Sequence, residues 1–176
     1  MFLKTGAQEQ MRNLLVVAAV VVLGILSGCS QQIRIPKYTG PEVTQVVVNK
    51  GARRMYLLHN QTILKKYDVA LGFRPRGSKR FEGDGRTPEG IYHIDRRNPR
   101  SSFYLSIGIS YPNRRDIAEA AAVGLDPGGD IFIHGRAKDY RKGKRDWTAG
   151  CIAVDNKEML EIYSMVRDGT QIVINP

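Results

Sequence analysis

The sequence predicts a mainly β domain, a sandwich or a barrel, that carries two short helices. Several short runs rich in β-branched and aromatic residues alternate apolar and polar positions, as half-buried strands do. Gly, Pro and Asn separate these runs at short intervals. Only two segments carry helix-capping signals, and they do not alternate with the strands as they would around a parallel sheet.

The first half of the domain is predicted to be an antiparallel meander. Strand-like runs cover residues 43–49, 53–59 and 62–72, and the turns Lys-Gly-Ala and Asn-Gln join them. A loop rich in Gly, Pro and Arg follows over residues 73–90. A loop of this length inside a compact domain is usually functional or mobile.

The second half is predicted to hold the remaining strands and both helices. The strands start at Ile91, cover residues 102–110 and 130–135, follow Gly150, and end the chain over 170–175.

The first predicted helix has Asp116 near its start and Gly124 near its end. In the second helix, Asp155 is the predicted cap, Glu158 completes a capping box and Gly169 ends the helix.

The N-terminal segment has the pattern of a secretory signal. Arg12 precedes an unbroken apolar run over residues 14–26, which is too short for a confident spanning helix. The sequence Leu-Ser-Gly-Cys that closes it resembles the lipobox of bacterial lipoproteins, with Cys29 as the lipidated residue. We expect a signal peptide over 1–28 and a tether over 29–42; an uncleaved anchor or an ordinary signal peptide are the alternatives.

This interpretation predicts a periplasm-facing protein of the bacterial cell envelope, held in the membrane by its N-terminal lipid. Ser30 after the lipidated Cys weakly favours the outer membrane. The net charge of +10 favours an anionic partner. Beyond a membrane, wall polymer or lipid head groups fit better than nucleic acid, and a basic surface without a particular partner is the alternative.

The cysteine count singles out Cys151. The chain has two cysteines, so if Cys29 carries lipid, Cys151 has no disulfide partner in this chain and is a candidate reactive thiol. The few Cys and His residues make a structural zinc site unexpected, and we predict no metal and no cofactor.

A catalytic pair is one interpretation of His134 and Cys151. His134 ends an apolar strand, and a thiol needs such a base to become a competent nucleophile. Gly150 would let backbone N–H groups approach an oxyanion. The alternatives are a Cys that packs as a small hydrophobe and a His that is a satisfied polar group.

Three motifs in order give the sequence its resemblance to a known family. Ile-Phe-Ile-His-Gly at 131–135 is followed by Thr-Ala-Gly-Cys-Ile-Ala-Val at 148–154. Residues 83–94 are similar to a Thr-Pro-x-Gly-x-Tyr stretch, and residues 46–72 resemble the opening strands. Together they resemble the L,D-transpeptidase catalytic (YkuD) domain over residues 43–176, and its YafK-like subgroup in particular.

The resemblance implies roles for individual residues. Cys151 matches the family's nucleophile, His134 the base, and Gly135 the residue whose carbonyl orients that base. The backbone of Ala149, Gly150 and Cys151 would form the oxyanion hole.

The residues around Cys151 match the family at one further position and depart from it at two others. Thr148 stands at a Ser/Thr position assigned to the substrate side. Ala149 departs from the common His and Ala153 from a common Arg or Asn, which puts the choice of substrate or acceptor in doubt, and a wall-binding protein with an inactive site stays an alternative.

The implied reaction is acyl transfer on peptidoglycan stem peptides. Cys151 would attack the carbonyl of the third stem residue, often meso-diaminopimelate, and D-alanine would leave. The acyl group would pass to an amine on another stem, to the lysine of a wall-linked lipoprotein, or to water; with water the protein would act as a hydrolase.

Residues around the pair are candidates for substrate binding. Arg136 opens a basic segment between base and nucleophile, and stem peptides carry free carboxylates. Tyr92 and Trp147 are candidates for the cleft wall, with core packing as the alternative for both. The segment also contains Lys138, Arg141, Lys142, Lys144 and Arg145.

Overall fold

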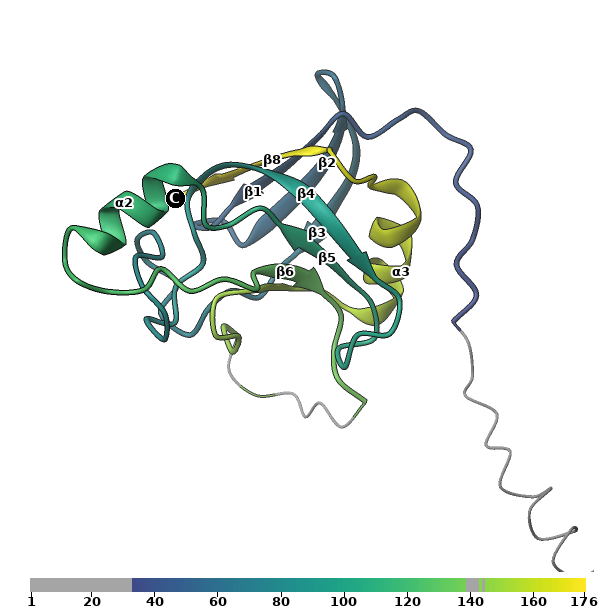
Figure 1. The fold of residues 1–176 in the computed structure, drawn as a ribbon. Coiled ribbons are helices and arrows are strands. Elements are labelled where there is room, and N and C mark those ends of the chain that lie inside the picture. The colour runs from purple at the N-terminus through teal and green to yellow at the C-terminus, as the bar shows by residue number, and fades with distance from the viewer. Residues whose placement is uncertain (1–32, 139–142, 144) are drawn as a thin grey trace, which may run out of the picture. The chain divides into compact units, whose positions relative to one another are not determined.

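The computed structural model describes residues 33–138, 143 and 145–176 (Figure 1). The chain divides into two units, residues 1–34 and 35–176, and every strand and helix named below belongs to the second. The predicted signal segment and Cys29 lie outside the described residues. In the described ranges, no helix has both the length and the apolar character needed to span a bilayer.

One eight-stranded sheet forms the domain, which confirms the mainly β prediction. Its order is β3-β2-β1-β8-β4-β5-β6-β7. The pairs β1–β8 and β6–β7 are parallel, and all other neighbours are antiparallel. The strands are β1 (Gln45–Asn49), β2 (Arg54–His59), β3 (Thr62–Asp68), β4 (Gly90–Asn98), β5 (Ser106–Ile109), β6 (Phe132–His134), β7 (Ile152–Ala153) and β8 (Gln171–Asn175).

The predicted meander is present as β1, β2 and β3. Alternate side chains of β1 and β2, such as Val46 and Leu57, are fully buried, while their neighbours face outward. In β3 most residues are exposed, including Lys65 and Lys66. Exposed lysines on a strand at the margin of a sheet oppose pairing with another chain.

The sheet curls until its two ends meet. Beyond β3, Ala70 exchanges backbone hydrogen bonds of 2.9 and 2.8 Å with Ala153 of β7. Farther along, the N–H of Phe73 donates to the carbonyl of Thr148 at 2.9 Å. The sequence leaves two architectures open, a barrel and a sandwich. The structure shows a single curled sheet that resembles a barrel.

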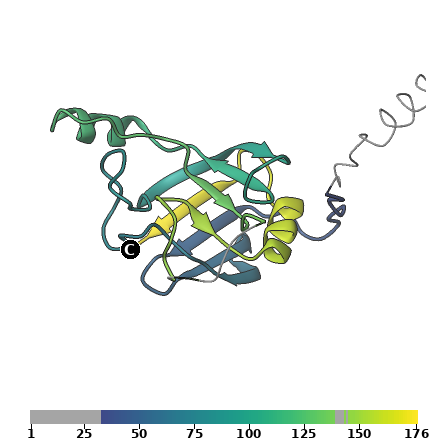
Figure 2. The ribbon, with the colours of Figure 1, turned by 90° about the horizontal axis from the view of Figure 1, so that it is seen from below.

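The two helices lie at opposite ends of the domain (Figures 1 and 2). Helix α2 (Arg114–Ala121) begins after Asn113, whose side chain accepts the N–H of Asp116 at 3.1 Å. Helix α3 (Asn156–Met165) buries Met159 and Ile162 against the sheet.

The start of α3 matches the predicted capping box, because the N–H of Asp155 donates to Glu158 Oε2 at 3.0 Å. Its predicted end was wrong. The helix stops at Met165, before Gly169, because the N–H of Gly169 at φ +86° donates to Ile94 on β4 and fixes the turn into β8.

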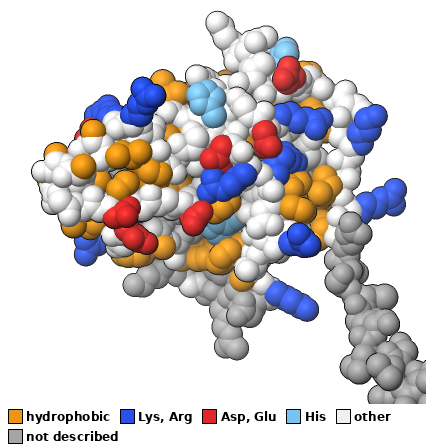
Figure 3. Space-filling view, in the orientation of Figure 1, with side chains coloured by type: hydrophobic (Ala, Val, Ile, Leu, Met, Phe, Trp, Pro, Cys, Tyr) orange, Lys and Arg blue, Asp and Glu red, His pale blue; other side chains and the backbone are white. Residues whose placement is uncertain are grey.

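Charge is distributed rather than gathered on the visible face. Figure 3 shows Lys and Arg interspersed with Asp, Glu and apolar side chains on this side of the domain. Several charges of the described residues are paired, as Lys65 is with Glu161 and Arg115 with Glu119.

Candidate active site

Parallel pairing of β6 with β7 brings His134 and Cys151 to one cleft. His134 ends β6, and Cys151 immediately precedes β7. The cleft has a volume of about 480 Å³. Its lining comes from the loop before β5, from β6 and from the turn before β7, and includes Phe103, Asp130, Phe132, His134, Trp147, Ala149 and Cys151.

The imidazole of His134 is fixed in one tautomer. Its Nδ1 lies 2.6 Å from the carbonyl oxygen of Gly135. A carbonyl can only accept, so Nδ1 carries the proton and Nε2 is left as the basic nitrogen. The side chain is 4% exposed, and burial lowers the pKa of His134 below its ordinary value of 6.5. At neutral pH the ring is therefore an uncharged base.

Aromatic side chains hold this ring in place. The ring of Phe103 lies 4.6 Å from that of His134, and Trp147 meets His134 edge-on at 5.7 Å. The sequence predicts a strand over 102–110 that includes Phe103, but β5 begins only at Ser106. Residues before it form a turn with Tyr104 at φ +73°, and this turn brings Phe103 onto the imidazole.

A glycine is required at position 135. A Cβ there would lie 2.5 Å from Asn156 Oδ1 and 3.0 Å from the carbonyl oxygen of Phe103. Asn156 uses the same oxygen to accept the N–H of Arg136 at 2.6 Å. The start of α3 therefore supports the backbone whose carbonyl orients His134.

The thiol of Cys151 is neutral at rest. Sγ accepts the N–H of Phe132 at 3.4 Å and lies 3.5 Å from the carbonyl oxygen of Asp130. Burial raises the pKa of the Cys151 thiol above its ordinary value, and Asp130 adds to the rise. Since both members of the pair are neutral, a proton has to pass from Sγ to His134 as the thiol attacks.

The turn before Cys151 is held by Thr148. Its hydroxyl donates to the carbonyl of Cys151 at 2.7 Å and accepts the N–H of Gly150 at 3.2 Å. This hydroxyl is held within the turn, where it fixes the backbone before Cys151. Thr148 also lines the cleft, and its place on the substrate side stays a prediction. Gly150 sits at φ +141°.

Two backbone donors remain for an oxyanion. The N–H of Gly150, one of three predicted donors, is already used by Thr148. Within the described part of the chain, no acceptor is paired with the N–H of Ala149 or Cys151. These two groups are the ones that can stabilise developing negative charge in the cleft.

The loop over 73–90 backs the nucleophile turn and is fastened by buried charge. Lys79 Nζ lies 3.3 Å from Asp84 Oδ1, and both side chains are under 5% exposed. Asp84 also accepts the N–H groups of Arg80 and Arg86, at 2.7 and 3.0 Å. A Cβ at Gly150 would lie 2.8 Å from the carbonyl oxygen of Arg86. The sequence does not predict the pair of Lys79 with Asp84.

One residue predicted to bind substrate, Tyr92, lies away from the cleft. Tyr92 does not wall it: the side chain is 1% exposed in the core, and its hydroxyl donates to Asp116 at 3.1 Å. The alternation of β4 turns this residue inward, so its assignment to substrate binding was wrong.

The basic segment is only partly described. Arg136 pairs with Asp155 at 2.7 Å and lines a second cavity next to the cleft. Trp147 lines both this cavity and the cleft. Arg141, Lys142 and Lys144 lie outside the described residues. Over the described ranges, no group of three or more His, Cys, Asp or Glu side chains is placed to hold a metal ion.

Similar proteins share the fold and the sequence pattern. YafK of Escherichia coli (strain K12), assigned to the L,D-transpeptidases, is 29% identical over 106 residues, which is 59% of this chain and 37% of YafK. YkuD of Bacillus subtilis (strain 168), with the same assignment, is 26% identical over 159 residues, 86% of this chain and 78% of YkuD.

Solved structures with a similar fold include L,D-transpeptidases and a cell shape determining protein. The helical cell shape determining protein Pgp2 from Campylobacter jejuni has a TM-score of 0.60 and 27% identity, over 82% of this chain and 51% of Pgp2. An L,D-transpeptidase from Mycobacterium smegmatis shares the fold, with a TM-score of 0.53 and 14% identity over 76% of this chain and 59% of that one. The chain spans about half of Pgp2 and just over a third of YafK.

The family profile agrees with both comparisons. The L,D-transpeptidase catalytic domain (YkuD) matches residues 44–174, nearly the whole of the folded unit. The chain belongs to the L,D-transpeptidase catalytic domain family.

Proposed function

We propose that this protein is a cysteine-dependent L,D-transpeptidase that acts on peptidoglycan stem peptides through a thioester acyl-enzyme. The observation that carries the proposal is the shared cleft of Cys151 and His134, in which the Gly135 carbonyl leaves His134 Nε2 as the free base. Family membership supplies the substrate class.

The geometry suits a stepwise acyl transfer. His134 Nε2 takes the thiol proton as Sγ of Cys151 bonds to the carbonyl carbon of the third stem residue. The oxyanion receives the N–H groups of Ala149 and Cys151. The carbonyl–nitrogen bond then breaks, and D-alanine leaves with the proton that His134 returns. The acyl group stays on Sγ as a thioester.

The second half of the reaction transfers the acyl group. An amine of another stem, or the lysine of a wall-linked lipoprotein, attacks the thioester and gives a proton to His134. The thiolate leaves and takes this proton from His134, which restores the neutral pair. Water in the same position would release the stem peptide instead. This hydrolytic outcome is the second candidate, and it is favoured by Ala149, which is exposed and presents only a methyl group to the cleft.

The setting we propose is the periplasmic side of the bacterial envelope, with the domain tethered by lipid on Cys29. Pgp2 is a helical cell shape determining protein. By analogy, we propose that the reaction remodels the wall and so contributes to cell shape.

Product analysis tests the proposal. The protein is incubated with purified tetrapeptide muropeptides, with and without a peptide that mimics the lysine end of a wall-linked lipoprotein, and the products are separated by mass. A transpeptidase gives cross-linked dimers or the lipoprotein-peptide adduct, and D-alanine is released in equal amount. Shortened monomers alone identify the hydrolase, and unchanged muropeptides contradict both activities.

A further inference from the structure

A second cavity lies against the nucleophile cleft, and Trp147 forms a wall of both. This flanking cavity has a volume of about 530 Å³, which is enough for an amino-acid-sized group. The indole centroid lies 5.7 Å from the ring of His134. A substrate whose backbone occupies the cleft can therefore place a side chain in the flanking cavity.

The floor of the flanking cavity is apolar. It is made by Val69 and Ala70 beyond β3 and by Ala153 and Val154 of the β7 segment. Ala70 and Ala153 join the two ends of the curled sheet by a pair of hydrogen bonds, and the N–H groups of Val69 and Val154 donate to other backbone carbonyls, so the backbone of the floor is hydrogen-bonded throughout. Such a strip suits the methylene groups of a side chain.

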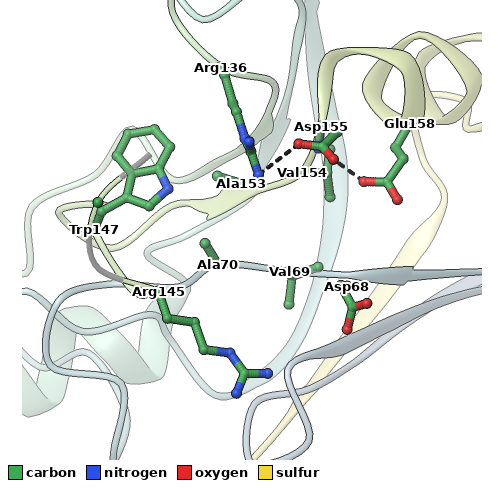
Figure 4. Close-up of a pocket in the computed structure, with 11 residues that line it drawn as sticks. Asp68, Val69, Ala70, Arg136, Arg145, Trp147, Ala153, Val154, Asp155 and Glu158 are labelled. Atoms are coloured by element: carbon green, nitrogen blue, oxygen red, sulfur yellow. Dashed lines mark hydrogen bonds and ion pairs between the residues drawn. The ribbon is translucent and has the colours of Figure 1, made fainter. Parts of the chain in front are cut away.

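Charged groups of both signs surround this floor (Figure 4). One pair is internally satisfied, because Arg136 Nη2 lies 2.7 Å from Asp155 Oδ1. Setting that pair aside leaves one guanidinium and two carboxylates, those of Arg145, Asp68 and Glu158.

Arg145 is available to a ligand. The carboxylate next to it in sequence, Asp146, is already bound by Arg53 at 2.9 Å and by the N–H of Leu71 at 3.1 Å. Among the residues that the structure describes, none forms an ion pair with Arg145. A free guanidinium in a cavity wall is suited to a carboxylate.

On the opposite side of the flanking cavity, Glu158 and Asp68 lie near a third carboxylate, that of Asp155, which Arg136 pairs. Burial raises the pKa of Glu158, and the carboxylates of Asp155 and Asp68 raise it further, which outweighs the opposing effects of the Asp155 N–H and of Arg136. The ion pair of Asp68 with Arg54, at 3.1 Å, lies at the surface and is weak. An ammonium group bound here would relieve the repulsion among these carboxylates.

We propose that the flanking cavity binds a zwitterionic amino-acid end group, with its carboxylate on Arg145 and its ammonium toward Glu158 and Asp68. A simple anion would face two carboxylates, and a simple cation would face the guanidinium. The inference rests on the proposed function. In a stem peptide, the far end of meso-diaminopimelate carries both groups on one carbon, a short methylene chain away from the carbonyl that Cys151 attacks.

The test compares two stem peptides that differ only at that end. Tetrapeptides with meso-diaminopimelate or with lysine at the third position are titrated into the full chain carrying Cys151→Ala. Trp147 is the single tryptophan of the sequence, so its fluorescence reports binding at both cavities. We expect the diaminopimelate peptide to bind about tenfold more tightly, because lysine lacks the carboxylate that Arg145 would hold.

Arg145→Ala should raise the Kd of the diaminopimelate peptide about tenfold, to the lysine value, and leave the lysine peptide no weaker. Arg167→Ala removes an equal charge from another exposed position and should change neither. Equal binding of the two peptides, a preference that survives Arg145→Ala, or no binding of either peptide would each overturn the inference.

The unsubstituted chain separates this inference from the proposed function. It is incubated with each peptide and scored by mass for acylated Cys151. Discrimination in binding without any acylation would contradict the transpeptidase and keep the flanking cavity as a binding site. Acylation by both peptides, with equal Kd values, would keep the transpeptidase and remove the flanking cavity from its mechanism.

Discussion

Breaking the ion pair of Lys79 with Asp84 tests whether the loop over 73–90 is fixed by buried charge. Asp84→Ala leaves the ammonium of Lys79 in a site where that side chain is 4% exposed, and it removes the acceptor of three backbone N–H groups. Loss of one partner from a buried pair destabilises a protein by about 3–5 kcal/mol. With an m-value of about 2 kcal/mol/M, the urea midpoint should fall by roughly 2 M.

Equilibrium unfolding in urea, followed by circular dichroism, measures this shift. Glu119→Gln is the matched control, because it breaks an exposed pair with Arg115 and should change the free energy of unfolding by under about 0.5 kcal/mol. Lys79→Met combined with Asp84→Asn should recover much of the loss, since no uncompensated charge stays buried. A midpoint for Asp84→Ala that matches the control would refute the argument.

The same pair gives the wild-type protein a dependence on pH. Burial alone would raise the pKa of Asp84, but the N–H groups of Arg80 and Arg86, together with Lys79, outweigh it and hold the pKa below the ordinary value. A carboxyl with a depressed pKa stabilises the fold above its unfolded pKa of about 3.9, and this contribution is lost as the pH falls through the folded pKa. Asp84→Asn should flatten this acid limb of the stability curve.

Three further predictions concern the cleft. Because burial lowers the pKa of His134, the acidic limb of the acylation rate should lie below pH 6.5, and a limb at or above that value contradicts a buried neutral base. Phe103→Ala uncovers the imidazole, so stopped-flow acylation should show this limb moving up toward about 6.5, whereas an unmoved limb would mean that Phe103 does not control burial of the ring. Gly150 has φ +141°, and Gly150→Ala places a Cβ 2.8 Å from the carbonyl oxygen of Arg86. The resulting strain of about 1–3 kcal/mol should slow acylation about tenfold or more. An unchanged rate would show that the turn tolerates a side chain.

The strand pattern could be predicted because burial alternates along the chain. The period of two in residues 45–49 and 54–59 follows directly from one buried and one outward face. Ends were harder to place, because tertiary hydrogen bonds decide them. Met165 ends α3 where Gly169 was expected, and the turn at Tyr104 shortens the strand predicted over 102–110.

The reactive pair could be predicted because its chemistry requires particular residue types, a thiol and an imidazole. His134, Gly135 and Cys151 carry local signals, and the structure brings them together at the β6–β7 edge. The residues that hold this pair and its surroundings in place could not be predicted. Phe103 against the imidazole and Asp84 within the loop over 73–90 act through contacts that appear only in the folded chain, and neither residue type signals such a role by itself.

The most direct test of the account is the intact mass of the protein after brief incubation with a tetrapeptide stem. We expect a mass increase equal to the stem peptide minus D-alanine, located on Cys151, reversed by hydroxylamine and absent from Cys151→Ala. His134→Gln should form the same adduct far more slowly while keeping the wild-type unfolding midpoint. Product formation by Cys151→Ala, or an adduct on any other residue, would contradict a thiol nucleophile in this cleft.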